Sequence, residues 1–494
     1  MSTTMSTAAN TAMSTTNGTW ELVIGLEVHC QLRTRSKIFC GCATSFGEAP
    51  NTNTCPVCLG LPGALPVLNA EAVELATRAS LALGCIVHEA SVFARKNYFY
   101  PDLPKGYQIS QFDRPLATDG SLVIGTQADR TPRVIRVHRV HMEEDAGKSV
   151  HDRFRDVSAI DLNRAGTPLV EIVSEPDIRS GAEAGAYARR MKQILEYAGV
   201  SDANMEEGSL RVDVNISIRP SSTSPFGTKT EIKNLNSFSA IERAVEIEFA
   251  RQCRVLESGG VIEQQTMLYD DKRNEVRPAR SKEGSHDYRY FPEPDLPPLR
   301  LAAAYIETQR AALPELPEAK RRRFATEYGL GDVEIEQLIV DQTLAAHYEL
   351  VARASGDARR AANWMLGTVL AAVNASGRSL GEHPVSAERL GALIKLEAAG
   401  EVSNTAARQV FGLMEQEGGE PLELAKREGL LQVRDDSALV GWIDEVFAEN
   451  PAEAARFVGG EKKLQGVLVG LVMKKSRGSA DPKKVNQLLG ARVG

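Results

Sequence analysis

The N-terminal half of the chain alternates between apolar and polar residues over short runs. The clearest run is 210–219, in which every even-numbered residue is apolar and every odd-numbered residue is polar. A period of two predicts a strand with one buried and one polar face. Residues 69–83 and 182–197 instead show helical spacing and good helix formers. The region from about 20 to 290 therefore predicts a sheet interrupted by helices.

Proline and glycine mark the ends of this region and of the next. Four prolines fall within 291–298 and exclude a helix or central strand there. Beyond them the pattern is helical to about 413, and Gly418-Gly419 predicts a hinge. Asp481-Pro482 is typical of a helix N-cap and first turn. One amphipathic stripe precedes it, formed by Leu464, Val467, Leu468, Leu471 and Val472.

These patterns predict an unstructured tail over 1–18, an α+β domain over 19–298, an all-α helical domain over 299–415 and an all-α tail domain over 416–494. The first 18 residues carry no charged side chain and fit neither a signal nor a transit peptide. We interpret them as a disordered tail or a misplaced start. No apolar run is long enough for a transmembrane helix, so we expect a cytoplasmic protein without membrane contact.

Charge is uneven along the chain. The net charge is −7, so any RNA partner needs a local basic patch. Between 462 and 484 only Asp481 opposes a set of cations. These cations either solvate helix ends or bind RNA phosphates. They are Lys462, Lys463, Lys474, Lys475, Arg477, Lys483 and Lys484.

Four of the seven cysteines lie within nineteen residues. Cys40 and Cys42 are separated by one residue, and after twelve further residues come Cys55 and Cys58, separated by two. This spacing is typical of zinc ligands, whereas an odd total argues against a disulfide framework. We predict a structural zinc site, with free thiols as the alternative.

The first strand combines a carboxylate with an imidazole. Glu27 and His29 are two residues apart, so they project from the same strand face. Such donors suit Mg²⁺ or Mn²⁺, although a solvated strand face is the simpler interpretation. Glu171 lies in an otherwise apolar strand, and residues 141–148 hold three consecutive acids that include Glu144. Together these segments supply the ligands of a magnesium–nucleotide site.

Residues 95–108 are rich in basic and aromatic side chains. Such groups neutralise phosphates or stack on a base, but a packed aromatic loop explains them equally well. The chain has no Walker A motif and no Rossmann glycine fingerprint, so a nucleotide would be held in another way.

Several long motifs in one order resemble the GatB family, the B subunits of tRNA-dependent amidotransferases. The resemblance runs from about residue 20 to the C-terminus. The motifs are 24–29 (IGLEVH), 95–102 (RKNYFYPD), 141–148 (HMEEDAGK), 161–168 (DLNRAGTP), 206–211 (EEGSLR), 233–238 (KNLNSF) and 287–295 (DYRYFPEPD).

The resemblance implies an enzyme subunit. It implies an N-terminal cradle domain with a glutamine-synthetase-like fold that uses ATP and Mg²⁺ to phosphorylate the side-chain carboxylate of Glu-tRNA(Gln) or Asp-tRNA(Asn). Ammonia from a glutaminase A subunit then gives the amide, and a small C subunit completes a heterotrimer. The helical and tail domains bind tRNA, with elbow contacts in the tail.

The resemblance also implies roles for individual residues. The metal ligands fall on Glu27, His29, Glu144 and Glu171. The nucleotide or phosphate contacts fall on Lys96, Asn97 and Tyr98. Two other functions compete with this prediction. A non-catalytic tRNA-binding scaffold would not need four converging metal ligands, and a zinc-ribbon nucleic-acid binder would use only the cysteines.

Overall fold

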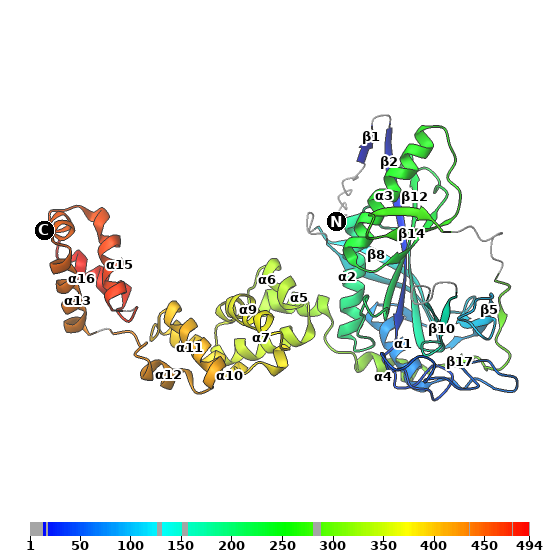
Figure 1. Cartoon of the computed structure of the whole chain (residues 1–494), viewed down its shortest axis with the longest axis horizontal. Coiled ribbons are helices and arrows are strands. Elements are labelled where there is room, and N and C mark those ends of the chain that lie inside the picture. Colours follow the sequence, from blue (N-terminus) through cyan, green and yellow to red (C-terminus); the bar gives the residue numbers. More distant parts are fainter. Residues whose placement is uncertain are drawn as a thin grey trace, which may run out of the picture. The chain divides into compact units, whose positions relative to one another are not determined.

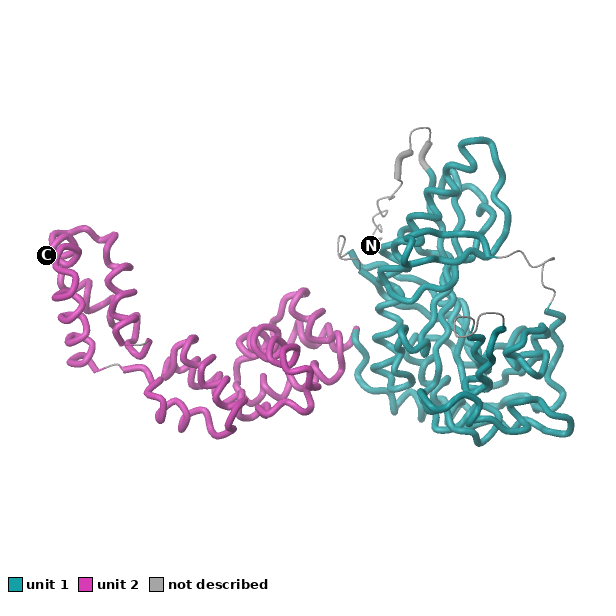
Figure 2. Tube along the Cα trace, in the orientation of Figure 1, with its two compact units in different colours: residues 1–317 teal, residues 318–494 magenta. Residues whose placement is uncertain are grey.

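The computed structural model describes residues 13–15, 18–125, 131–150, 157–279, 288–433, 435–476 and 478–493. They belong to two compact units, residues 1–317 and 318–494 (Figure 2). The N-terminal unit combines a large sheet with helices, and the C-terminal unit is built from helices (Figure 1). This confirms the predicted α+β domain followed by all-α structure.

The N-terminal unit is built on a ten-stranded sheet with β2 (Gly18–Gln31) near its centre. β12 (Leu210–Arg219) and β11 (Pro168–Ser174) flank β2, and both run antiparallel to it. The strand order is β15-β14-β13-β12-β2-β11-β8-β7-β3, with β1 (Met13–Thr15) paired to β2. The other strands are β3 (Ile86–Val87), β7 (Ala117–Ile124), β8 (Arg133–Glu144), β13 (Thr230–Leu235), β14 (Thr266–Asp270) and β15 (Glu275–Pro278).

The apolar face of this sheet is covered by helices. The β2 residues Leu26, Val28 and Cys30 are at most 1% exposed, in one core with side chains of α1 (Ala70–Ala82), α2 (Gly181–Tyr197) and α3 (Phe238–Glu257). Burying these side chains is the main favourable term for the fold. The predicted strand over 210–219 and the predicted helices over 69–83 and 182–197 are therefore confirmed.

Smaller sheets border the large one. β16 (Phe291–Pro292), β5 (Phe93–Asn97) and β6 (Tyr107–Gln111) form a three-stranded sheet. β6 is fastened to the end of β8, because the Gln111 side chain accepts from the Met142 amide at 3.0 Å. Two further pairs join β9 (Lys148–Val150) to β10 (Ala159–Asp161) and β4 (Ala90–Ser91) to β17 (Leu299–Arg300).

The N-terminal unit continues past the proline-rich segment. Leu301, which precedes α4 (Ala303–Ala311), and Ile306 within α4 belong to the core of this unit. The Arg78 side chain of α1 also donates to Gln309 of α4 at 2.8 Å. The prolines therefore end secondary structure near the boundary predicted at residue 298, while the packing of this core continues beyond it.

The described residues of the C-terminal unit form two hydrophobic cores. The first extends from Phe324 to Ala425. It involves helices α5 (Pro317–Glu327), α6 (Asp332–Leu338), α7 (Gln342–Ser355), α8 (Ala358–Asn363), η1 (Trp364–Val369), α9 (Leu370–Ser376), η2 (Leu380–Glu382), α10 (Ala387–Ala398), α11 (Asn404–Glu417) and α12 (Pro421–Arg427). Because Leu424 and Ala425 are buried in this core, α12 packs with the helices that precede residue 416, the predicted start of the tail domain.

The second core joins α13 (Asp436–Glu449), α14 (Pro451–Val458), η3 (Lys462–Leu464), α15 (Gln465–Lys475) and α16 (Pro482–Gly490). Leu468 and Val472 of the predicted stripe are fully buried, but Val467 is 52% exposed, so the stripe is narrower than predicted. Asp481 caps α16 as expected, accepting from the Lys483 amide at 2.9 Å.

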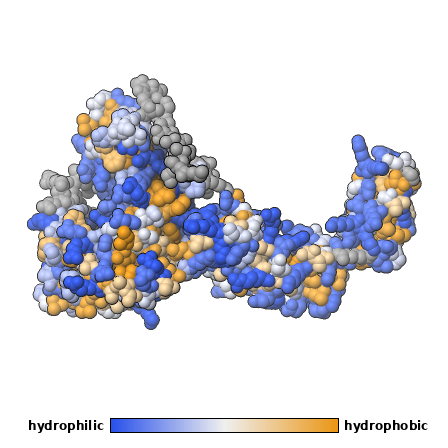
Figure 3. Space-filling model, turned by 180° about the vertical axis from the view of Figure 1, so that it is seen from behind, coloured by the Kyte–Doolittle hydropathy of each residue, from blue (hydrophilic) through white to orange (hydrophobic). Residues whose placement is uncertain are grey.

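The predicted N-terminal tail is only partly described. Residues 1–12 and 16–17 lie outside the described residues, whereas Met13–Thr15 pair with the start of β2. On the face shown in Figure 3, hydrophobic areas are interspersed with hydrophilic ones. Among the described residues, no helix is long and apolar enough to cross a membrane.

Candidate functional site

The second face of the central strands carries polar side chains. His29 of β2 lies opposite Glu171 of β11 on one side and Arg211 of β12 on the other. Cross-strand partners project to the same face, so these side chains share one surface with Glu27. The predicted pairing of Glu27 and His29 on a polar strand face is present in the structure.

His29 forms a compact group with two carboxylates. Its Nε2 lies 3.4 Å from Oε2 of Glu171 and 3.8 Å from Oε1 of Glu143. One donor atom from each of the three side chains lies within 4.8 Å of the other two. An imidazole nitrogen and two carboxylate oxygens so close together fit one shared cation of the Mg²⁺ or Mn²⁺ class.

Sequence reasoning did not assign a role to His141, which contacts the same group. On β8 it lies opposite Glu171, with Nε2 at 3.1 Å from Oε2 of Glu171 and 3.9 Å from Oε2 of Glu143. Its side chain is almost fully buried, and Nδ1 has no hydrogen-bond partner among the described residues. The alternation of β8 places 139, 141 and 143 on one face, and this signal was available in the sequence.

Glu144 does not join the group. As the neighbour of Glu143 it projects to the opposite face, where it pairs with Lys105 and accepts from the Ile109 amide at 2.8 Å. The close group therefore contains Glu143, whereas the resemblance implies Glu144 as a metal ligand. The physical reason is the two-residue period of the strand.

Glu27 lies at the edge of the group. Its Oε1 accepts from Nδ2 of Asn215 at 2.9 Å. Burial and the negative charges of Glu171 and Glu231 raise the pKa of Glu27. A carboxylate in this position favours a proton or a cation as a neighbour.

The charges of the group also favour a cation. Burial alone would lower the pKa of His29, but a hydrogen bond to Glu171 and the charges of Glu171 and Glu143 raise it to about 9. Burial opposes the ionised form of Glu171, yet His141 and His29 hold the pKa of that carboxyl well below its usual range. The site therefore concentrates negative charge that attracts protons in the absence of a metal.

Lys96 and Arg139 accompany this face in addition to Arg211. Lys96 of β5 lies with its ammonium 4.9 Å from the centre of the Tyr288 ring. Burial lowers the pKa of Lys96, but its interactions with the Glu143 carboxylate and with Tyr290 outweigh burial and raise the pKa. Arg139 precedes His141 by two residues on β8, and its buried Nε has no hydrogen-bond partner among the described residues.

Of the three residues predicted to contact the nucleotide, only Lys96 brings a positive charge next to the acidic group. The Asn97 amide donates to the Tyr288 carbonyl at 2.9 Å, and its Nδ2 donates to the Arg289 carbonyl at 2.8 Å. The Tyr98 ring lies edge-on to Tyr288, and its hydroxyl donates to Gln108 at 3.5 Å. Asn97 and Tyr98 therefore fasten the segment after residue 287 to β5.

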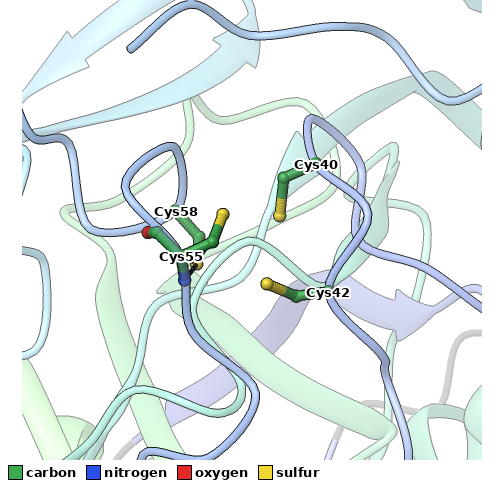
Figure 4. A group of neighbouring side chains, drawn as sticks. All are labelled: Cys40, Cys42, Cys55 and Cys58. Carbon is green, nitrogen blue, oxygen red and sulfur yellow. Dashed lines mark hydrogen bonds between the residues drawn. The ribbon is translucent and has the colours of Figure 1, made fainter. Parts of the chain in front are cut away.

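The four predicted zinc ligands converge. In Figure 4 the side chains of Cys40, Cys42, Cys55 and Cys58 point toward one common space. One sulfur from each lies within 4.8 Å of the others. Cys58 is buried and the other three are partly buried. Four thiols at this spacing fit a tetrahedral structural metal site, and zinc is compatible with it.

The thiols differ in how readily they ionise. A hydrogen bond with Cys40, a backbone amide at Cys55 and the charge of Lys37 lower the pKa of Cys58 to about 4. Burial raises the pKa of Cys42 to about 11. Zinc binds thiolates, so these cysteines release protons when the metal binds.

A cavity of about 140 Å³ separates the cysteine loop from Glu144. Its polar and charged lining comprises Lys37, Cys40, Cys58, Lys105 and Glu144. The cysteine loop therefore faces the back of the strand whose other face carries Glu143.

The predicted basic patch of the tail is only partly exposed. Lys462, Lys463, Lys474 and Lys483 are exposed, whereas Arg477 lies outside the described residues. Lys475 pairs with Glu449 and Glu445, and Lys484 pairs with Asp436. The exposed lysines come from η3, α15 and the start of α16.

Comparisons with known proteins agree with this architecture. Residues 22–307 match the family model described as the GatB/GatE catalytic domain, and residues 346–493 match the model described as the GatB domain. The chain is 48% identical over 475 residues to the B subunit of the aspartyl/glutamyl-tRNA(Asn/Gln) amidotransferase of Solidesulfovibrio magneticus, covering 96% of this chain and 99% of that protein. It is 50% identical to the corresponding B subunits of Nitrosococcus oceani and Chlorobium chlorochromatii, covering 95% of this chain and 98% of each relative.

Proposed function

The chain belongs to the GatB family of amidotransferase B subunits, and from this premise we propose that its sheet face activates the side-chain carboxylate of a mischarged tRNA. It is a subunit of the aspartyl/glutamyl-tRNA(Asn/Gln) amidotransferase and carries the family's catalytic domain. The enzyme is a ligase that forms a C–N bond with glutamine as the amide donor.

The proposed reaction has two steps. A carboxylate oxygen of the Glu or Asp attached to tRNA attacks the γ-phosphorus of ATP, the bond to the bridging oxygen breaks, and ADP leaves. The nitrogen of ammonia then attacks the acyl carbon, the bond to the phosphate oxygen breaks, and the nitrogen loses a proton. Phosphorylation is needed because a free carboxylate is a poor acceptor of ammonia.

The observation that carries this proposal is the convergence of His29, Glu143 and Glu171 within 4.8 Å. With Glu27 beside them, these residues would hold Mg²⁺. When bound, Mg²⁺ supplies positive charge that offsets the phosphates and the attacking carboxylate. The raised pKa of His29 supports a cation at this position, because the pKa is raised by the negative charges of the neighbouring carboxylates.

The cations beside this face fit the phosphates of ATP. Arg139 has a buried Nε without a partner among the described residues, and a guanidinium binds phosphate through two parallel hydrogen bonds. Lys96 supplies a second positive charge next to Glu143. We assign phosphate contact to Lys96 and Arg139, and a supporting role to Asn97 and Tyr98.

The remaining features complete the proposed assembly. The four cysteines hold a structural zinc. The exposed lysines of the tail contact tRNA phosphates, and salt screens this contact. The partners are a glutaminase A subunit, which releases ammonia, and a small C subunit, and the three chains form a heterotrimer.

Reconstitution tests the proposal. The chain is combined with A and C subunits, and amide formation on Glu-tRNA(Gln) and Asp-tRNA(Asn) is measured with and without ATP and Mg²⁺. We expect amide only when both are present. A complex that binds tRNA and releases ammonia but forms no amide even with ATP and Mg²⁺ present would instead support a non-catalytic tRNA-binding scaffold.

A further inference from the structure

Lys37 is a buried cation beside the cysteine loop. Its side chain is about 1% exposed, and it forms no ion pair with an acidic side chain among the described residues. Its ammonium instead donates to the carbonyls of Asn53 at 2.6 Å and Leu162 at 3.3 Å and to Sγ of Cys58 at 3.7 Å. A buried charge is costly unless it is compensated, so the position of Lys37 requires a negative partner.

The cysteine cluster provides that partner. A zinc ion with four thiolate ligands carries a net charge of about −2. The three hydrogen bonds of Lys37 use all three donors of an ammonium, and one of them goes to a ligand sulfur. Lys37 is therefore placed to offset part of the negative charge of the occupied cluster.

Lys37 also joins two loops. The Leu162 carbonyl belongs to the segment 161–167, which lies against the cysteine loop. The Asn53 amide donates to Oδ1 of Asn163 at 2.8 Å, and the Ile38 amide donates to the Gly166 carbonyl at 2.9 Å. Gly166 has φ of +85°, and a Cβ there would lie 3.5 Å from both Lys37 and Cys58. Gly166 therefore lies in van der Waals range of both Lys37 and the cysteine loop.

The segment 161–167 leads to the acidic end of the candidate site. The Gly166 amide donates to the Asp145 carbonyl at 2.8 Å, and the Asp145 amide donates to the Thr167 carbonyl at 2.8 Å. The Asp145 carboxylate accepts from Gln31 at 2.8 Å and from Arg211 at 2.9 Å. Gln31 lies two residues from His29 on β2, so a continuous set of contacts connects the cysteines to the catalytic strands.

We propose that Lys37 is a positioning residue that compensates the charge of the cysteine-bound metal and fastens the cysteine loop to the segment 161–167. It thereby links retention of that metal to the order of the backbone around Asp145. This inference depends on the proposed structural zinc and is independent of the proposed ATP chemistry.

Substitutions at Lys37 test whether its positive charge helps the cysteines to retain their metal. Lys37→Met keeps the length of the side chain and removes the ammonium, and Lys37→Arg keeps the charge. Lys229→Met, at an exposed lysine in the same unit, is the matched control. Zinc content and the rate of zinc transfer to a chromogenic chelator are measured on the full-length chain.

Removing a hydrogen-bond partner of a metal ligand typically lowers metal affinity about 10–100-fold. We expect zinc release about 10-fold faster or more from Lys37→Met, and close to the unmodified rate from Lys37→Arg and from the control. The charge-transfer band of the Co²⁺-substituted protein should also move to lower energy in Lys37→Met, because the sulfur loses a hydrogen bond. Equal release rates and unchanged bands in folded Lys37→Met would overturn the proposal, as would zinc-free protein purified without chelators.

A measurement without substitution covers the case in which Lys37→Met does not fold. Hydrogen–deuterium exchange is recorded on the unmodified full-length chain before and after zinc is removed by a chelator. We expect faster exchange over 161–167 and at the backbone next to Asp145, with α13 unchanged as an internal reference. Unchanged exchange over 161–167 after complete zinc removal would contradict the proposed link.

Discussion

The two donor clusters of the N-terminal unit are built in opposite ways. The four cysteines come from one stretch of nineteen residues, and the loop between them has no other metal donor that joins the cluster. The acidic cluster takes His29, Glu143 and Glu171 from three strands, and these strands meet only because β2, β11 and β8 are neighbours in the sheet. The cysteine cluster holds its loop together, whereas the side chains of the acidic cluster are held in place by the sheet.

This difference predicts different consequences of damage. A sheet holds its side chains in place before any metal arrives, so loss of one acidic ligand should remove metal binding and leave the fold intact. A loop without its metal lacks the contacts that fix its backbone, so loss of one cysteine should act first on stability.

Replacement of Glu143 should have the largest effect. Glu143→Gln removes a charged ligand and keeps the side-chain shape, so amide formation should fall by about 100-fold or more. The readout is ATP-dependent amide formation in the reconstituted complex, with thermal unfolding unchanged. The matched control is Glu144→Gln on the opposite face. Loss of its buried pair with Lys105 should lower stability, but the Mn²⁺ affinity of the folded variant should stay within about threefold of the unmodified protein.

Replacement of His141 should have the next largest effect. His141 contacts Glu171 and Glu143, so His141→Asn should weaken Mn²⁺ binding by about 10–100-fold. Titration with Mn²⁺, followed by its electron paramagnetic resonance signal, measures this affinity. An unchanged affinity would show that His141 is outside the metal environment.

Replacement of a cysteine should show the opposite pattern. Cys58→Ser should remove zinc and lower the midpoint of thermal unfolding of the N-terminal unit by on the order of 5 °C. Its Mn²⁺ affinity should stay within about threefold of the unmodified protein if the sheet alone organises the acidic cluster. A larger loss of Mn²⁺ affinity would show that the two clusters are coupled more strongly than their contacts indicate.

A change in the tail should affect neither cluster. Lys474→Ala combined with Lys483→Ala should reduce the slope of log K against log salt for tRNA binding by about 1.8, since each phosphate contact contributes about 0.9. Zinc content and Mn²⁺ affinity should not change. Lys426→Ala on α12 is the control, and an identical salt slope in the double variant and this control would exclude the tail lysines as phosphate contacts.

The contrast between the clusters also explains how far the sequence predicted the site. The cysteine spacing is local, so it was sufficient to predict convergence of Cys40 to Cys58. The polar faces of β2 and β12 followed from their alternation. The alternation of β8 alone puts Glu143, and not Glu144, on the face of His141. That Glu171 shares this face follows from the register of β8 against β11.

The domain boundaries also depend on contacts between distant residues, which the sequence pattern does not reveal. The prolines before residue 299 and the glycines at 418 and 419 mark real interruptions of secondary structure. They did not reveal that Ile306 packs into the core of the preceding unit or that Leu424 packs into the helical core. Local sequence determines where an element ends, but packing between distant elements determines where a unit ends.

Anomalous X-ray diffraction at the Mn and Zn edges tests the central claim most directly. Crystals of the reconstituted complex would be grown with Mn²⁺ and a non-hydrolysable ATP analogue. The account predicts a Mn peak in contact with His29, Glu143 and Glu171 and a separate Zn peak at the four cysteines. A Mn peak bound by Glu144, or none at His29 while the analogue is bound, would contradict it.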